Sequence, residues 1–451
     1  MLFSSLTFLL FFLPFVLIVH RVLPRALQNP FLLVSSLLFY AWRDLRYLPL
    51  FVALLLLSWG AGLLIAFLKS RNARRAVLTG AAAILAGTLL GYKICAAWQP
   101  YPEPGSLTGS SLPLGISFFS FQLIGYLADV YREDTPPERN LAAFGTFAFL
   151  FPQLVAGPIV RYSEIRKPLH ELRRPGAEDL NAGAVQFVKG LAFKVLLANR
   201  LGEAWNVLSG ISGSSASSWL GILSFSLQIY FDFYGYSLMA CGMGRMLGFP
   251  FPENFRDPYL SRTVSEFWRR WHITLGAWFR DYVYIPLGGS RKGLPRTLAH
   301  LFLVWMLTGL WHGAAPNFLL WGLWHFLFIA LEKTVLKTAW SRHPLLSRIV
   351  TLLAVILGWV LFAFDDPGRL LSFAGRLFSF AESGVFLFSI RQYGLLLLAA
   401  LLCTATPLTG RIAGWLANRP VPAAAVCAVL LVLCMAALAN ASYNPFLYFR
   451  F

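Results

Sequence analysis

Long apolar runs alternate with short polar connectors along the whole chain. A helix needs about 20 mostly apolar residues to cross the hydrocarbon core of a bilayer. Runs of roughly this length or longer lie at 4–20, 30–68, 76–98, 112–129, 141–160, 182–209, 219–248, 299–335, 349–364, 384–406 and 421–441. The pattern predicts an all-α polytopic membrane protein with about eleven transmembrane helices.

Two of these runs are longer than one span and carry internal breaks. The run 30–68 is interrupted at 42–46 (WRDLR), and the run 299–335 is interrupted by Gly and Pro between 309 and 317. We expect each to hold two helices. Gly, Pro and Ser within 112–129 and 141–160 favour re-entrant or broken helices there. The first run has no preceding basic residue and no small-residue cleavage motif, so we expect a retained helix and not a signal peptide.

Residues 249–298 depart from the apolar pattern. The segment is rich in arginine and contains Phe267, Trp268, Trp271, Trp278 and Phe279 close together. Thr263 with Glu266 three residues later has the spacing of a capping box that opens a helix, and the glycine pair 288–289 is typical of a turn. A basic, tryptophan-rich amphipathic helix commonly lies in the membrane interface.

Composition and charge support a membrane domain. Only 13% of the 451 residues are charged, against about 25% in soluble proteins. The net charge is +18, and its basic residues lie between apolar runs, which points to anionic lipid headgroups as partners. No nucleic-acid-binding motif is present, so we expect no nucleic-acid partner. The five cysteines show no CxxC pair and are expected to be buried hydrophobes. We expect a single membrane domain spanning 1–451.

The histidines are the strongest candidates for catalytic residues in the chain. Of seven histidines, His272 follows an arginine–tryptophan run, His312 lies between glycines at a predicted helix break, and His325 ends a second tryptophan-rich run. A histidine in an apolar segment is costly and can exchange a proton near neutral pH; a hydrogen-bonded structural role is the alternative for each. No carboxylate stands at metal-ligand spacing, so no metal site is expected. Asp232, also within an apolar run, can be functional or can be a structural group bonded to a neighbouring helix.

Several motifs together resemble the membrane-bound O-acyltransferase family, and within it the bacterial alginate O-acetyltransferase branch. They are FDFYGYS at 231–237, PENF at 252–255, EFWRRWHI at 266–273, WFRDY at 278–282, IPLGG at 285–289, GLWHG at 309–313, and the segments 1–5 and 443–451. The resemblance implies a ring of helices around a central cavity. It also implies an enzyme of the bacterial inner membrane that moves an acetyl group from a cytoplasmic thioester to an extracytoplasmic polysaccharide, directly or through a periplasmic or secreted acetyltransferase partner.

The same resemblance assigns residues. His312 corresponds to the catalytic histidine of the family and His272 to its partner histidine. Beyond the resemblance, we expect Arg269, Arg270 and Arg280 to bind an acidic donor such as acetyl-CoA, with contact to lipid as the alternative for each. Asp232, Trp311, Asn317 and His325 are expected to line the cavity, and no permanently bound cofactor is expected.

Three other functions remain open. The first is D-alanyl transfer to teichoic acid from an acyl carrier protein, which uses the same chemistry with another donor. The second is transport of an acylated intermediate without catalysis, and the third is a structural role in a polymer-secretion complex. The last two would not need His312.

Overall fold

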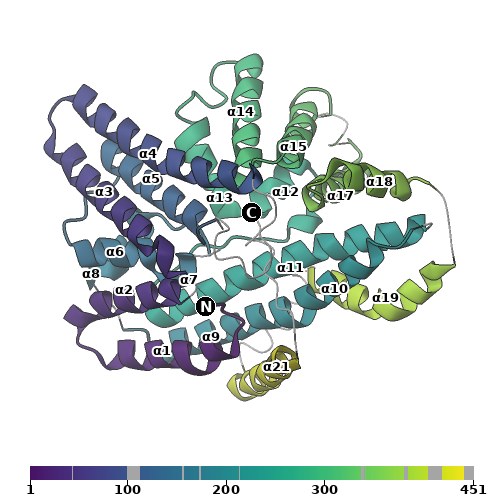
Figure 1. Cartoon of the computed structure of the whole chain (residues 1–451), viewed down its shortest axis with the longest axis horizontal. Helices are drawn as coiled ribbons and strands as arrows, with labels where there is room; N and C mark the ends of the chain where they lie inside the picture. Colours follow the sequence, from purple (N-terminus) through teal and green to yellow (C-terminus); the bar gives the residue numbers. More distant parts are fainter. Residues whose placement is uncertain are drawn as a thin grey trace. The chain divides into compact units, whose positions relative to one another are not determined.

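The computed structural model is all-helical in the part of the chain that it describes (Figure 1). The described residues are 1–42, 44–98, 112–154, 157–171, 174–212, 214–336, 340, 342–379, 384–404 and 419–440. Within these ranges the only extended pairing is an isolated bridge between Phe255 and Trp271. The C-terminal motif at 443–451 lies outside the described residues.

The chain forms two compact units. The first contains Met1–Phe187, Tyr236–Glu253 and Arg280–Tyr282, and the second contains Val188–Gly235, Asn254–Phe279 and Val283–Phe451. A single domain spanning 1–451 stays a prediction.

The first unit is built mainly from the N-terminal helices. They are η1 (Phe8–Phe12), α1 (Leu13–Val22), α2 (Arg25–Ala41), η2 (Leu45–Tyr47), α3 (Leu48–Phe67), α4 (Arg71–Trp98), α5 (Ile116–Arg132), α6 (Leu141–Phe149), α7 (Phe151–Leu154), α8 (Tyr162–Glu171) and the first part of α9 (Ala177–Ala192). Helices α3, α4 and α5 pack side by side (Figure 1). The predicted break at 42–46 is confirmed, because α2 ends at Ala41 and α3 begins at Leu48.

The second unit holds most of the histidines. Its helices are η3 (Phe193–Ala198), α10 (Asn199–Leu208), the first part of α11 (Ser215–Leu247), η4 (Pro258–Leu260), α12 (Val264–Arg270), α13 (Ile273–Phe279), α14 (Leu294–His312), α15 (Pro316–Thr334), α17 (Pro344–Ala363), α18 (Pro367–Leu377), α19 (Val385–Thr404) and α21 (Pro420–Asn440). A short π-helical stretch, η5 (Arg280–Tyr284), begins in the first unit and ends in the second. Helix α15 packs against both α14 and α17.

Six helical segments of the described ranges are long and apolar enough to cross a membrane. They are Leu45–Phe67, Arg71–Ala96, Ala177–Leu208, Pro344–Ala363, Val385–Thr404 and Val421–Asn440. The chain is therefore a multi-pass helical membrane protein, as its hydropathy pattern predicts. The predicted number of about eleven spans is not confirmed.

Candidate active site

His312 is the last residue of α14, and its side chain is buried. The helix ends there because Gly313 adopts an extended conformation and Pro316 begins α15. The predicted break between 309 and 317 is thus confirmed, and it places an imidazole at a helix end. The ring of His312 lies 5.0 Å, centroid to centroid, from the rings of both Trp321 and Phe362.

Two glycines bring α14 and α15 into close contact beneath this histidine. A Cβ atom on Gly309 would lie 2.5 Å from the carbonyl oxygen of Phe318, and one on Gly322 would lie 2.5 Å from that of Trp305. Contacts this short leave no room for a side chain at either position. The glycines therefore fix the spacing of the two helices that carry His312 and His325.

His272 lies between α12 and α13, where its backbone adopts a left-handed conformation with φ of +46°. This conformation is unfavourable by about 1–2 kcal/mol for a residue with a Cβ atom, so the surrounding structure must hold it. Asn254 supplies the contacts. Its carbonyl oxygen Oδ1 lies 3.1 Å from Nδ1 of His272 and accepts from the Thr274 hydroxyl at 2.8 Å, while its backbone oxygen accepts from the Ile273 amide at 3.0 Å.

These contacts determine the form of the His272 ring. Because Oδ1 of Asn254 can only accept, Nδ1 of His272 donates the hydrogen, which leaves Nε2 of the uncharged ring with its lone pair. Burial lowers the pKa of His272 from 6.5 to about 3. The side chain is therefore uncharged at neutral pH, in the form that can accept a proton or hydrogen bond at Nε2.

Helix α12, which precedes His272, is anchored at its first turn. The Thr263 hydroxyl accepts from the Glu266 amide at 3.0 Å, so the predicted helix cap is confirmed. Glu332 of α15 accepts from the amide and the hydroxyl of Ser265, at 2.9 and 2.6 Å. From α17, the Thr351 hydroxyl donates to the carbonyl oxygen of Arg262 at 3.0 Å. Two long helices thus hold the segment that carries His272.

Three histidines alternate with two tryptophans in one continuous run of ring contacts. The successive centroid distances from His272 to Trp311, His312, Trp321 and His325 are 6.0, 4.5, 5.0 and 5.1 Å. The structure therefore brings together His272, His312, His325 and Trp311, which lie in three separate motifs of the sequence.

Asn317 and Asp232 have partners on neighbouring helices. The Asn317 amide donates to the carbonyl oxygen of Leu361 at 3.3 Å, at the end of α17. Asp232 of α11 forms a buried ion pair with Lys194 of η3, with 2.6 Å between Nζ and Oδ1. Asp232 is thus a buried group bonded to a neighbouring helix, and a role in the cavity stays a prediction.

The three arginines proposed to bind the donor differ in their surroundings. Arg269 is exposed. Arg270 pairs with Glu266 at 2.6 Å. Arg280 belongs to the first unit, where its Nε lies 2.6 Å from Asp281, a carboxylate that also pairs with Arg161.

The family model of the membrane-bound O-acyltransferases matches residues 137–364 of this chain, which include every site residue named above. A probable alginate O-acetylase from Pseudomonas putida is 39% identical over 396 residues, covering 85% of this chain and 81% of that protein. The chain belongs to the membrane-bound O-acyltransferase family. This O-acyltransferase is also 30% identical to a Helicobacter pylori peptidoglycan O-acetyltransferase, covering 80% of this chain and 77% of that protein. With a Bacillus subtilis teichoic acid D-alanyltransferase the identity is 30%, over 57% and 68% of the respective chains.

Sequence reasoning missed three contributors to this O-acyltransferase site. Asn254 lies within the PENF motif that contributes to the resemblance, and neither Glu332 nor Lys194 is among the predicted site residues. The signal for Lys194 and Glu332 is a charge inside an apolar segment, which predicts a buried partner. Asn254 has no such signal, because its role depends on a chain reversal that brings it beside His272.

Proposed function

We propose that this O-acyltransferase moves an acetyl group from a cytoplasmic acyl thioester, such as acetyl-CoA, to a hydroxyl of an extracytoplasmic polysaccharide. The observation that carries the proposal is the buried imidazole of His312 at a helix end, in ring contact with a run that contains two further histidines. The acetyl-transferring relatives cover 80–85% of the chain and the D-alanyl-transferring one 57%. This difference favours acetyl over D-alanyl transfer.

His312 acts as the general base in this reaction. The acceptor hydroxyl oxygen forms a bond to the thioester carbonyl carbon while its proton moves to His312, and the carbonyl π pair moves onto oxygen. The intermediate then collapses, the carbon–sulfur bond breaks, and the leaving thiolate takes the proton from His312. Ester and thiol are the products, and His312 is regenerated uncharged.

His272 assists from a fixed position. Its Nε2 lone pair can accept a hydrogen bond from the acceptor hydroxyl or from His312 once protonated, and its clamp on Asn254 prevents ring rotation. Arg269, as the exposed member of the arginine set, is the first candidate for a donor phosphate, with Arg270 and Arg280 as further candidates. Asp232, Trp311, Asn317 and His325 support the cavity.

The setting that we propose is the cytoplasmic membrane of a bacterium, with membrane lipids around the helices. A periplasmic or secreted acetyltransferase is the partner that would pass the acetyl group to the glycan when transfer is indirect. In that case the partner's nucleophile takes the place of the glycan hydroxyl in the first step.

The test is His312→Ala in a host that lacks its own copy of this enzyme. We expect acetyl ester in the exported polysaccharide to be lost, at least 100-fold, while the amount of membrane-inserted protein stays normal. His343→Ala, which removes an exposed histidine before α17, is the matched control and should acetylate normally. Wild-type acetyl content in the His312→Ala strain would overturn the proposal. Acetyl-CoA and an acyl-loaded carrier protein, offered separately to purified membranes, distinguish the two donors.

A further inference from the structure

His325 of α15 is fully buried beside a cluster of indole rings. Its ring centroid lies 4.8 Å from that of Trp268, 5.1 Å from Trp321 and 5.4 Å from Trp305. Trp268 and Trp321 also contact each other, at 5.3 Å. Trp268 comes from α12 and the other two from α14 and α15, so three helices contribute rings to the cluster.

The ring nitrogens of three residues in this cluster lack protein partners within the described ranges. Neither ring nitrogen of His325 forms a hydrogen bond there, nor do the indole nitrogens of Trp268 and Trp321. A buried polar group without a partner costs about 1–3 kcal/mol. An uncharged imidazole carries one N–H and each indole carries one, so the cluster presents three N–H donors. Helix carbonyls are already bonded within their helices, so a bound oxygen atom is the natural complement.

The backbone of α17 is shaped to admit the His325 ring. A Cβ atom on Gly358 would lie 2.8 Å from Nε2 of His325 and 3.0 Å from Cε1. Any other residue at this position would displace the ring from the tryptophan cluster. The absence of a side chain at position 358 therefore allows the His325 ring to keep its place in the cluster.

We propose that His325, Trp268 and Trp321 form the oxyanion site of the acyl transfer, which rests on the proposed function. Trp321 contacts both His312 and His325, at 5.0 and 5.1 Å between ring centroids. The proposed general base, His312, and the N–H donors are therefore adjacent to the same indole ring. When the acceptor oxygen bonds to the carbonyl carbon and its proton passes to His312, the carbonyl oxygen gains the π pair. The N–H donors stabilise that negative charge until the pair returns and the thiolate leaves. Donors held ready in a dry site are worth far more to such a charge than donors in water.

The experiment removes the N–H groups one at a time and keeps the rings. His325→Phe, Trp268→Phe and Trp321→Phe should each lower acetyl ester in the exported polysaccharide, per amount of folded protein, on the order of 10²-fold. His325→Gln keeps an amide N–H and should retain more activity than His325→Phe. Trp324→Phe is the matched control, since the Trp324 indole already donates to the Ala354 carbonyl at 2.8 Å, and it should acetylate within about threefold of wild type.

Gly358→Ala tests the same site without changing a polar group. The added methyl should displace the His325 ring and lower acetylation at least 10-fold. Gly375→Ala, where an added Cβ has no neighbour within 4 Å, should have no effect.

Two results would overturn the proposal. One is wild-type acetylation by His325→Phe. The other is a loss of acetylation that only follows a loss of folded protein, with the unfolding midpoint in detergent as the measure of folding. That outcome would indicate that the cluster binds a structural water and not the carbonyl oxygen. The His312→Ala result separates this failure from failure of the proposed function. If His312→Ala is inactive and His325→Phe is not, only the oxyanion site is wrong.

Discussion

His272 shows how one residue can depend on a neighbour that is distant in sequence. Its left-handed backbone and its ring orientation are both fixed by Asn254, which precedes it by eighteen positions. An unfavourable backbone conformation that the surroundings maintain is typical of functional sites. The strain at His272 therefore supports its place beside His312 in the reaction.

Asn254→Ala should uncouple His272 from its support. The change removes the acceptor for the His272 ring and for the Thr274 hydroxyl, so we expect acetylation to fall at least 10-fold and stability to fall by about 2 kcal/mol. Thr274→Val removes one bond to Asn254 and leaves the His272 bond, so it should reduce acetylation by less than threefold. Acetyl content of the exported polysaccharide and the unfolding midpoint in detergent are the measurements. Equal activity in wild type and Asn254→Ala would contradict this role.

Individual residues were predictable from sequence only where a motif or a misplaced charge marked them. GLWHG marked His312, and an acid in an apolar run marked Asp232. Trp268 and Trp321 carried no distinguishing mark, since the chain has 15 tryptophans and only the packing of three helices shows which of them surround His325.

At the scale of elements, the π-helical turn η3 is the least expected feature. A single π-helical turn within an α-helix is rare and often marks a functional position. Here it lies between α9 and α10 and carries Lys194, whose ammonium group contacts Asp232 of α11 and Asn199 of α10. A Cβ atom on Gly235 of α11 would lie 2.6 Å from the carbonyl oxygen of Gly190 of α9. The backbones of α9 and α11 are therefore in close contact beside the ion pair.

The Lys194–Asp232 pair should show strong coupling in a double-mutant cycle. Lys194→Met alone or Asp232→Leu alone leaves a buried partner without its counter-charge, and each should cost about 3–5 kcal/mol. The double variant has no uncompensated charge and should recover most of that loss. Unfolding midpoints in detergent measure the cycle, with the exposed Arg200–Glu203 pair as a control whose coupling should stay below about 1 kcal/mol. If the effects of the substitutions at 194 and 232 on the free energy of unfolding are additive, the two residues are not energetically coupled.

Element boundaries followed from the sequence where apolar runs were broken by charge, Gly or Pro, as at 42–46 and 309–317. Periodicity could not reveal η3, because a π-turn inserts one residue without changing the apolar character of 182–209. Nor could it show that 249–298 is held by Glu332 and Thr351, since those contacts come from helices far along the chain.

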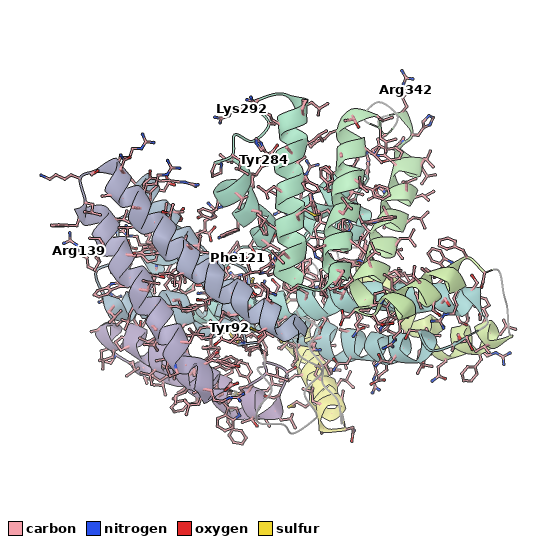
Figure 2. All side chains as sticks on the ribbon, turned by 45° about the horizontal axis from the view of Figure 1, so that its top comes forward. Tyr92, Phe121, Arg139, Tyr284, Lys292 and Arg342 are labelled. Atoms are coloured by element: carbon pink, nitrogen blue, oxygen red, sulfur yellow. The ribbon has the colours of Figure 1, made fainter. Side chains whose placement is uncertain are left out.

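At the scale of the whole molecule, basic residues mark one end of the helices in the second unit. In the second unit, Lys292 lies before α14 and Arg342 before α17, and Figure 2 shows both projecting beyond the helices. Cytoplasmic loops carry the excess of Lys and Arg in membrane proteins. This end of the second unit is therefore expected to face the cytoplasm.

This orientation has a consequence for His312. Helix α14 has 19 residues, so at 1.5 Å a residue His312 lies about 27 Å from the basic end of this helix. Asp365 and Asp366, after α17, mark that opposite end. If the basic end faces the cytoplasm, the proposed function would have the polysaccharide acceptor reach His312 from the opposite end of α14 and the donor thioester reach it from the basic end.

Lys292→Cys and Arg369→Cys test this orientation directly, because they place thiols at opposite ends of the helix set in a background without the five native cysteines. An impermeant maleimide applied to intact spheroplasts should label position 369, at the start of α18, and should label position 292 only after the membrane is permeabilised. Removing Arg369 strengthens the charge asymmetry, so the substitution itself does not favour inversion. The parent without cysteines is the control for non-specific labelling, and acetylation by both variants verifies that they fold. Labelling of position 292 in intact spheroplasts would reverse the orientation and would place His312 on the donor side of the membrane.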